Sequence, residues 1–554
     1  MITGARAIAE MLDGYGVTHL FHVPAVLRRT MVELEKHTSI KRLRPHGEAS
    51  AAYMADGYAR ASGRPGLCAA QVVGAHNLAA GLRDAFLAHS PVIALTGGRD
   101  PHTKFRKVYQ EIDDIPAFET VTKLNATIDS VERIPDMLRQ AFRVATSGSP
   151  GPVHLQFAGN EAQLDADEAE MDLGCETRYA KVPPFRPTAP DADLIETLAL
   201  LGKAERPVIV AGGGVRASGA GPALVALAER LSIPVATSLN AKDAIPGTHA
   251  LSVGVVGTYS RGSANRVVLD ADLIFFIGTE TGGMTTHFWK VPPLGADVIQ
   301  LDIDPEALGR NYPPRVAINA DARTALERML ELADLPGGHT AWSEVAAGHV
   351  NEWRLEYAPL LESEQVPMRP ERLCAELTDL VPDDGIVVVD TGHAGMWMGG
   401  MFDITASTQT YLRSAGHLGW AFPASLGAKC AHPERPVVCF TGDSGFWYHV
   451  AEIETAVRWG INSITVVNNN HSGNQSKRGF DRVYGGKQTE KALEMWVFTE
   501  VDFAALAEQI GAIGIRVDKP GDLAPAFDRA LSADRPVVLD VVTDIDALAP
   551  VAVE

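Results

Sequence analysis

The chain has 554 residues, of which 46% are hydrophobic and 21% charged, and its formal net charge is −20. This length exceeds what one hydrophobic core serves, so two to four domains are expected. No apolar run reaches the roughly 18 residues of a membrane span, and the acidic balance leaves little positive charge to neutralise phosphates, so we expect neither a membrane protein nor a nucleic-acid binder.

The amino-terminal segment is expected to form a helix and not a secretory signal. Thr3 is a suitable helix cap, and Ala5, Ile8 and Leu12 recur on one apolar face. The five cysteines are scattered, and no two of them form a CxxC pair. Both features predict a protein of the reducing cytoplasm, with the cysteines as small core residues.

Short strand-like runs alternate with helical segments over about the first 165 residues, which predicts a parallel α/β domain. Within it, the stretch HGEASAAYMADGYARASG predicts a helix that begins near Glu48, with Ala52, Ala55 and Ala59 on the same face. Because this face is small, another element should pack closely on it. Taken alone, Glu48 would be a first-turn acid that the helix dipole favours.

A linker and a second domain follow. Residues 160–191 are acidic and then proline-rich, which is typical of a linker. In residues 190–335, RPVIVAGGGVRASGA predicts a strand, a glycine turn and a helix, and DLIFFIGTE and DVIQLDIDP predict two further buried strands. The GGG turn alone is a weak signal for a nucleotide site. A second linker is predicted at about 335–369.

The third domain contains the most specific stretch, from Gly442 to Ser472. After the strand-like run PVVCFT it has a GDSG turn, a helical segment, the apolar run 464–467 and a cluster of asparagines, which together predict a βαβ unit. Asp443 and Asn470 then fall past the carboxyl ends of its strands, where open parallel sheets bind ligands. With the Ser472 carbonyl and phosphate oxygens, they would make an octahedral Mg²⁺ site, and the glycines let the backbone approach a diphosphate closely.

This stretch resembles the thiamine diphosphate motif, Gly-Asp-Gly followed by Asn-Asn, with Ser444 in place of the usual third glycine. The alternative for the stretch alone is an ordinary Rossmann-like turn with a surface aspartate. The resemblance covers essentially the whole chain and extends to the superfamily of acetolactate synthases, benzoylformate decarboxylases and 2-hydroxyacyl-CoA lyases. It implies three doubly wound parallel-sheet domains: pyrimidine-binding (1–165), middle Rossmann-like (190–335) and diphosphate-binding (365–554).

The resemblance also implies a role for each candidate site residue. Glu48 would act on the pyrimidine N1′ and drive the imino tautomer that removes the C2 proton. In GHLGWAFPASLGAK, Leu418 would be the apolar wedge that bends the cofactor, and the Gly416 carbonyl would accept a hydrogen bond from the 4′-amino group. Gln110, in VYQEID, maps to the synthases' active-site glutamine. The other implied cofactor contacts are Gly74, Asn77, His393, Ala394, Gly442, Asp443, Ser444, Gly445, Asn470 and Ser472, of which Asp443, Asn470 and Ser472 would bind the metal.

Some positions depart from the family pattern. His22 and His76 stand where relatives carry small residues, and each is either a pocket residue or a loop histidine with its hydrogen bonds satisfied. In the middle domain, the segment after Gly278 lacks the arginine that holds FAD in acetolactate synthases, and Glu280 adds a negative charge. We therefore expect no tightly bound FAD, whereas ADP or CoA, which related lyases hold in this domain, stays open.

The first functional interpretation is an acetolactate-synthase-like carboligase acting on small 2-oxoacids. The alternatives are a 2-hydroxyacyl-CoA lyase, an acyloin lyase or decarboxylase with an aldehyde or acyl-CoA substrate, and a non-catalytic relative that uses the fold for binding. Gln110 favours a synthase or lyase over a simple decarboxylase, but Gly479 falls where synthases place the tryptophan that selects the acceptor. Because the two halves of the cofactor are held by different subunits in this family, a homodimer is the minimum and a homotetramer is expected.

Overall fold

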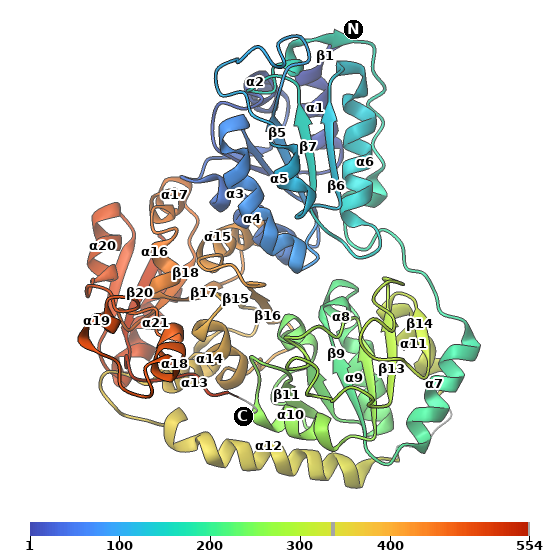
Figure 1. The fold of residues 1–554 in the computed structure, drawn as a ribbon, viewed down its shortest axis with the longest axis vertical. Helices are drawn as coiled ribbons and strands as arrows, with labels where there is room; N and C mark the ends of the chain where they lie inside the picture. Colours follow the sequence, from blue (N-terminus) through green and yellow to red (C-terminus); the bar gives the residue numbers. More distant parts are fainter. Residues whose placement is uncertain (334–337, 552–554) are drawn as a thin grey trace.

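The computed structural model describes residues 1–333 and 338–551, and in it the chain forms three domains, each built on a six-stranded parallel sheet. This confirms the predicted fold class. Figure 1 shows the amino-terminal domain in blue above the carboxy-terminal domain in orange and red, with the middle domain in green beside the latter. The predicted end of the middle domain at residue 335 lies outside the described residues.

The amino-terminal sheet has the order β3-β2-β4-β5-β7-β6. Its strands are β2 (His19–His22), β3 (Lys41–Leu43), β4 (Gly66–Ala70), β5 (Val92–Gly97), β6 (Leu124–Ile128) and β7 (Val153–Phe157). Its helices are α1 (Gly4–Gly14), α2 (Arg28–His37), α3 (Glu48–Ser62), α4 (Ala75–Leu87), α5 (Ile115–Glu119) and α6 (Ile134–Thr146). Thr3 caps α1 by accepting a hydrogen bond from the Arg6 N–H, and α3 begins at Glu48. Residues 160–191 contain only short elements, among them β8 (Glu168–Ala169), which pairs with β1 (Ile2–Thr3).

Helix α3 has two small faces, and each is in close contact with another helix. Ala52, on the predicted face, lies against α4 so closely that a Cβ on Gly81 would approach the Ala52 Cβ to 2.7 Å. The other face meets α15 (Ala421–Ala431) of the carboxy-terminal domain, where a Cβ on Gly57 would lie 2.0 Å from the Ala424 carbonyl oxygen. The two domains are therefore joined through backbone contacts that require glycine.

The middle sheet has the order β11-β10-β9-β12-β13-β14. Its strands are β9 (Pro207–Ala211), β10 (Val235–Thr237), β11 (Ser252–Val255), β12 (Leu273–Ile277), β13 (Val298–Asp302) and β14 (Ala317–Asn319). The helices of this domain are α7 (Asp191–Lys203), α8 (Gly213–Ala217), α9 (Gly221–Leu231), α10 (Gly262–Asp270) and α11 (Ala322–Leu332).

The predicted second linker contains a long helix, so that prediction is wrong for most of its length. Helix α12 (Thr340–Leu361) has 22 residues and runs along the bottom of Figure 1 from the middle domain to the carboxy-terminal domain. Trp342, Ala346 and Trp353 are buried on it, and the Arg261 guanidinium lies 4.3 Å from the Trp353 ring. Other apolar residues of the helix, such as Val345 and Leu355, are exposed, so the sequence shows no clear apolar stripe and resembled a linker.

The carboxy-terminal sheet has the order β16-β15-β17-β18-β20-β19. Its strands are β15 (Ile386–Val389), β16 (Thr410–Arg413), β17 (Val437–Gly442), β18 (Ile464–Asn469), β19 (Ile513–Val517) and β20 (Val537–Val542). The helices besides α15 are α13 (Pro370–Leu380), α14 (His393–Met401), α16 (Asp443–Trp447), α17 (Glu452–Trp459), α18 (Gln475–Val483), α19 (Glu490–Leu493), α20 (Phe503–Ile510) and α21 (Leu523–Leu531).

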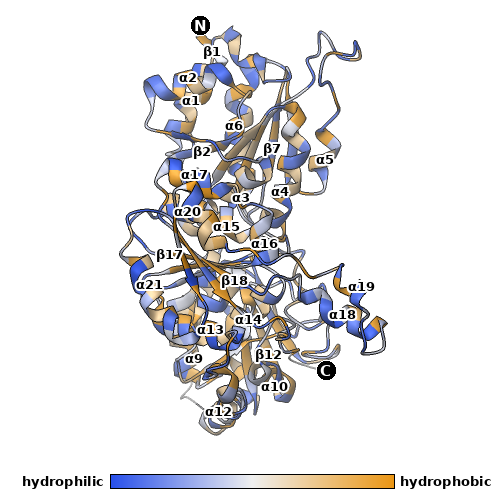
Figure 2. Cartoon of the chain, turned by 90° about the vertical axis from the view of Figure 1, so that its left-hand side faces the viewer, coloured by the Kyte–Doolittle hydropathy of each residue, from blue (hydrophilic) through white to orange (hydrophobic). Residues whose placement is uncertain are grey.

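Two features of this domain matter for the site. The helical segment predicted after the Gly442 turn is two helices, α16 and α17, and not one. Strands β17 and β18 are buried and appear in orange at the centre of Figure 2, as expected for parallel strands covered on both faces, whereas α18 is mostly blue. Across the described ranges, no helix combines the length and the apolar character needed to cross a membrane.

Candidate cofactor site

Asp443, Asn470 and Ser472 lie together at the carboxyl ends of β17 and β18, which are adjacent in the sheet. The Asp443 carboxylate accepts hydrogen bonds from the backbone N–H of Ser444 (2.7 Å) and of Ser472 (2.9 Å). The Ser472 hydroxyl in turn donates to the Asn470 amide oxygen at 2.9 Å. The three residues predicted to bind metal thus form one connected group.

The chemistry of this group fits a hard divalent cation. Burial raises the pKa of Asp443 to about 7, although its two backbone N–H partners lower it, so an ionised carboxylate here calls for a nearby cation. A carboxylate, an amide oxygen and a backbone carbonyl are the oxygen donors that Mg²⁺ takes when phosphate supplies the rest. In the part of the chain that the structure describes, no group of three or more His, Cys, Asp or Glu is arranged to hold a metal ion by itself.

The loop that carries Gly416 and Leu418 follows β16. Gly416 has a φ of +147° with open space where a Cβ would be, and Leu418 is 40% exposed. That exposure distinguishes Leu418 from an ordinary core leucine. His393 is the first residue of α14, with Ala394 next to it, and burial lowers the pKa of His393 to about 4, so the ring is neutral at pH 7.

Two buried aspartates that sequence reasoning missed fix this loop. Asp390, directly after β15, accepts hydrogen bonds from the Gly419 N–H and the Thr441 hydroxyl, each at 3.0 Å. Asp84, on α4 of the amino-terminal domain, accepts from the His417 N–H (3.1 Å). It also accepts from the Ala415 N–H (2.8 Å) and the Ser414 hydroxyl (2.9 Å). A signal was present for Asp390, an acid at a strand's carboxyl end, but none distinguished Asp84 from a surface acid.

In the amino-terminal domain, Glu48, Gly74 and Asn77 are brought together. The Asn77 side-chain amide donates to the Glu48 carboxylate at 3.2 Å. A Cβ on Gly74 would lie 2.4 Å from Glu48 Oε1, so only glycine leaves room for the carboxylate in this position. The three residues come from the start of α3 and from the turn that leads into α4.

Gln110 and the two histidines are placed differently. Gln110 has a φ of +64° and accepts a hydrogen bond from the Gln71 amide at 2.8 Å, which holds it near the carboxyl end of β4. His76 contacts the buried Asp114 at 2.9 Å, and burial raises the pKa of Asp114 to about 6. Burial lowers the pKa of His22 to about 4, and within the described ranges its Nδ1 has no hydrogen-bond partner.

Gln475 is a further residue beside Leu418 that sequence reasoning missed. Its amide contacts the Tyr259 hydroxyl of the middle domain at 3.4 Å. A Cβ on Gly392 would lie 2.4 Å from the Gln475 Oε1 and 4.0 Å from Leu418 Cδ2, so Gln475 and Leu418 flank the same backbone turn. The only available signal was its place just after the asparagine cluster.

The glycine turn of the middle domain has a structural explanation. A Cβ on Gly212 would lie 2.2 Å from the Gly278 carbonyl oxygen, so the GGG turn lets two strand ends approach each other. The Glu280 carboxylate at the second of these ends pairs with His89 (3.4 Å) and Arg310 (3.6 Å).

Between the described residues of one chain, no hydrogen bond or ion pair joins the Glu48 group to the Asp443 group. Hydrogen bonds between their domains flank Glu48: the His46 N–H donates to Glu452 at 3.1 Å, and the Ser50 hydroxyl contacts the His449 Nδ1 at 2.9 Å. The two halves of the candidate site are thus separate assemblies in a single chain.

Comparison with known proteins gives three family matches that together follow the three domains. Residues 2–117 match the thiamine pyrophosphate enzyme N-terminal TPP binding domain, residues 194–329 the central domain, and residues 390–541 the C-terminal TPP binding domain. A probable acetolactate synthase large subunit of Methanocaldococcus jannaschii is 32% identical, over 98% of this chain and 92% of the relative. The acetolactate synthase large subunit of Corynebacterium glutamicum is 31% identical, over 99% and 87%. A glyoxylate carboligase of Escherichia coli O157:H7 is 30% identical, over 97% and 92%.

Proposed function

Because the chain belongs to the thiamine pyrophosphate enzyme family and is an enzyme that depends on this cofactor, we propose that it joins two small 2-oxoacids. The proposal agrees with its similarity to acetolactate synthase large subunits and to a glyoxylate carboligase over nearly the full chain. The observation that carries the proposal is the exposed Leu418 side chain, which lies beside Gln475. Its two neighbours in the chain are fixed by buried aspartates, since the His417 N–H donates to Asp84 and the Gly419 N–H donates to Asp390.

The oxygen donors of the Asp443 group would bind Mg²⁺, and this metal would hold the cofactor's diphosphate. The backbone at Gly442, Ser444 and Gly445, together with His393 and Ala394 at the start of α14, would contact the diphosphate oxygens. When bound, thiamine diphosphate would supply a nucleophilic carbon for chemistry at the substrate carbonyl. Leu418 would support the cofactor's bent shape, and the Gly416 carbonyl would accept a hydrogen bond from the 4′-amino group.

Glu48 would hold a proton at N1′ of the aminopyrimidine. The Asn77 amide, which donates to the Glu48 carboxylate, would fix its orientation, and Gly74 leaves the space it needs. Gln475 would offer its amide N–H to the substrate carboxylate from beside the wedge. Gln110 would approach the substrate from the amino-terminal domain, where Gln71 positions it.

The separation of the Glu48 and Asp443 groups within one chain supports a site completed by a second copy. We propose that Glu48 of one subunit faces Asp443 of the partner in a homodimer, and that two dimers form a homotetramer. The expected compartment is the cytoplasm.

The test is product analysis on protein loaded with thiamine diphosphate and Mg²⁺. Pyruvate and glyoxylate are supplied singly and together, and CO₂ and new C–C products are quantified by mass spectrometry. We expect CO₂ release with a condensed hydroxy-oxoacid product. Release of the free aldehyde alone would assign the decarboxylase alternative, and cleavage of an acyloin or a 2-hydroxyacyl-CoA would assign a lyase.

A further inference from the structure

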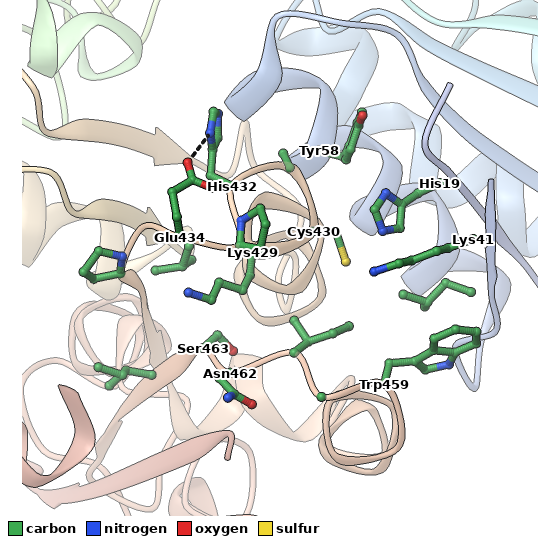
Figure 3. A pocket seen from close by; sticks show the side chains of 18 of the residues that line it. His19, Lys41, Tyr58, Lys429, Cys430, His432, Glu434, Trp459, Asn462 and Ser463 are labelled. Atoms are coloured by element: carbon green, nitrogen blue, oxygen red, sulfur yellow. Dashed lines mark hydrogen bonds and ion pairs between the residues drawn. The ribbon is translucent and has the colours of Figure 1, made fainter. Parts of the chain in front are cut away.

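A cavity of about 710 Å³ lies between the amino-terminal and carboxy-terminal domains, remote from the candidate cofactor site (Figure 3). It is lined by His19 and Lys41, the first residues of β2 and β3, and by Val437 and Ile464, the first residues of β17 and β18. The candidate cofactor residues follow the carboxyl ends of the strands in the same two sheets. The cavity therefore lies at the amino-terminal ends of the strands, opposite the candidate cofactor residues, and is a separate site.

The lining of this cavity is positively charged, although the chain as a whole has a net charge of −20. Its carboxylate is Glu434, which contacts His432 at 3.3 Å, as Figure 3 shows. Against this single acid stand four cationic side chains: Lys41, Arg64, Lys429 and Arg535. A concave site lined by one sign of charge concentrates ligands of the opposite sign.

The protein neutralises these four cations only in part. Among the residues that the structure describes, the Lys41 ammonium makes no hydrogen bond or ion pair. Arg64 and Lys429 contact only carbonyl oxygens, of Gly16 (3.0 Å) and Arg435 (2.7 Å) respectively. Arg535 lies 3.9 Å from the exposed Asp534, and Lys41, Arg64 and Arg535 are themselves exposed, so water solvates them. A concave group of cations with few acidic partners still favours binding of an anion.

The charge of Lys41 affects the pKa of a residue in each of the two domains that form the cavity. Burial, followed by the charge of Lys41, lowers the pKa of His19 in the amino-terminal domain to about 4. The same charge opposes the burial that raises the pKa of Cys430, in the carboxy-terminal domain, to about 12. Figure 3 shows the Lys41 ammonium directed across the cavity toward the carboxy-terminal domain, whereas the Lys429 ammonium points away from Lys41 and donates to the Arg435 carbonyl. An anion beside Lys41 would lie in a cavity whose carboxy-terminal wall also includes Lys429 and Arg535.

The remaining lining fits an organic ligand. Trp459 is 37% exposed and offers an aromatic surface at the rim, and Asn462 and Ser463 offer hydrogen-bonding groups. The volume is within the roughly 300–1,000 Å³ of small-molecule pockets. We propose that this cavity is an effector site for a small organic anion of nucleotide size that carries two or more negative charges.

The site has a direct structural connection to the catalytic residues. Helix α3 begins at Glu48 and brings Tyr58 and Ser62, near its carboxyl end, to the cavity. Helix α15 follows the Leu418 loop and brings Lys429 and Cys430 to the cavity. A ligand in this cavity would contact the carboxyl-terminal ends of α3, which begins at Glu48, and of α15, which follows the Leu418 loop. Because it binds only the folded arrangement of the two domains, it would also stabilise the folded protein.

The experiment is isothermal titration of protein already saturated with thiamine diphosphate and Mg²⁺, so that the cofactor site cannot take up the probes. ATP, inorganic pyrophosphate and citrate are titrated separately, with free Mg²⁺ kept constant. The variant Lys41→Gln removes one cation that has no recorded partner, and Arg64→Gln is an independent second variant in case the first fails to fold. Lys203→Gln, exposed on α7 of the middle domain, is the matched control.

We expect at least one probe to bind the wild-type protein, and roughly five- to tenfold more weakly to Lys41→Gln and to Arg64→Gln. Lys203→Gln should bind as the wild type does. Binding of ATP and pyrophosphate with this pattern assigns phosphate as the anionic group, and binding of citrate assigns a polycarboxylate. If no probe binds, or if binding is the same in both cavity variants as in the wild type, the proposal is wrong.

Discussion

The Asp84 carboxylate of the amino-terminal domain accepts a 3.1 Å hydrogen bond from the backbone N–H of His417 in the carboxy-terminal domain. His417 immediately precedes Leu418, so the predicted wedge is positioned by a residue of another domain. Asp84 also receives a 2.8 Å hydrogen bond from Arg60 and is fully buried. The loop, α3 and α4 therefore form one connected unit around a single carboxylate.

The first prediction concerns this carboxylate. Asp84→Asn keeps the size of the side chain but loses the charge that pairs with Arg60 and organises the loop. We expect a loss of about 2–4 kcal/mol in the free energy of unfolding, because the buried Arg60 loses one of its two carboxylate partners, of which Asp56 is the other, and the loop N–H groups lose their charged acceptor. Denaturant unfolding measures this change, and Asp136→Asn on the exposed face of α6 is the control. A stability equal to that of the control would show that the contact does not fix the loop.

The second prediction concerns the metal. Asp443→Ala removes the only charged protein ligand of the proposed site, so Mg²⁺-dependent binding of thiamine diphosphate should be abolished. Isothermal titration measures it, with Asp518→Ala, an exposed acid of the same domain, as the control. Unchanged cofactor affinity in Asp443→Ala would refute the assignment of the metal site.

The pattern of successes and omissions has a physical basis. The Glu48 helix and the βαβ unit around Asp443 were predictable because strands, turns and small helix faces are local and periodic. The contacts of Asp84 with the Leu418 loop join residues more than three hundred positions apart, and nothing in the local pattern of α4 marks them. Helix α12 was missed because its apolar residues do not mark one face: Trp342 and Trp353 are buried, whereas Val345 and Leu355 are exposed. Residue types indicated the chemistry of the site, but its supporting contacts depend on the packing of domains.

The third prediction concerns the middle domain. In the segment after Gly278, the resemblance to acetolactate synthases predicts an arginine that binds FAD. This chain has no arginine there and instead has Glu280, which pairs with His89 and Arg310. We therefore expect purified protein to be colourless. An absorbance spectrum of the protein and of its acid-released cofactors tests this, and a stoichiometric flavin band would overturn it.

The fourth prediction is a pH dependence at the contact between the middle and carboxy-terminal domains. Lys242 is buried there, and its ammonium donates to the Gly399 carbonyl at 2.9 Å, near Arg261 and Asp403. Burial lowers the pKa of Lys242 to about 7 from 10.5. Between these values the unfolded chain binds a proton that the folded chain does not, so Lys242 makes the free energy of unfolding rise with pH.

The measurement is the free energy of unfolding at pH 7.0 and at pH 8.5 for the wild type and for Lys242→Met. The wild type should gain up to about 1.4 kcal/mol per pH unit more than the variant, which cannot titrate at this position. Equal pH dependence in the two proteins would mean that Lys242 keeps its ordinary pKa in the folded state.

The last prediction separates catalysis from cofactor binding. Glu48 is expected to hold a proton at N1′ of the pyrimidine and to contact neither phosphate nor metal, so Glu48→Gln should still bind thiamine diphosphate. The glutamine can keep the contact with Asn77, which lies 3.2 Å from the carboxylate. What should be lost is exchange of the C2 proton, since a positioned acid–base group contributes about 10²–10⁴-fold in rate.

The observable is C2 proton exchange on the bound cofactor, followed by NMR after acid quench, with cofactor affinity measured on the same preparations. We expect exchange at least ~10²-fold slower in Glu48→Gln, with affinity changed by well under one decade. Glu35→Gln, an exposed acid on α2, should exchange at the wild-type rate. If Glu48→Gln also exchanges at the wild-type rate, then Glu48 is only a helix-start residue and the group that activates the cofactor lies elsewhere.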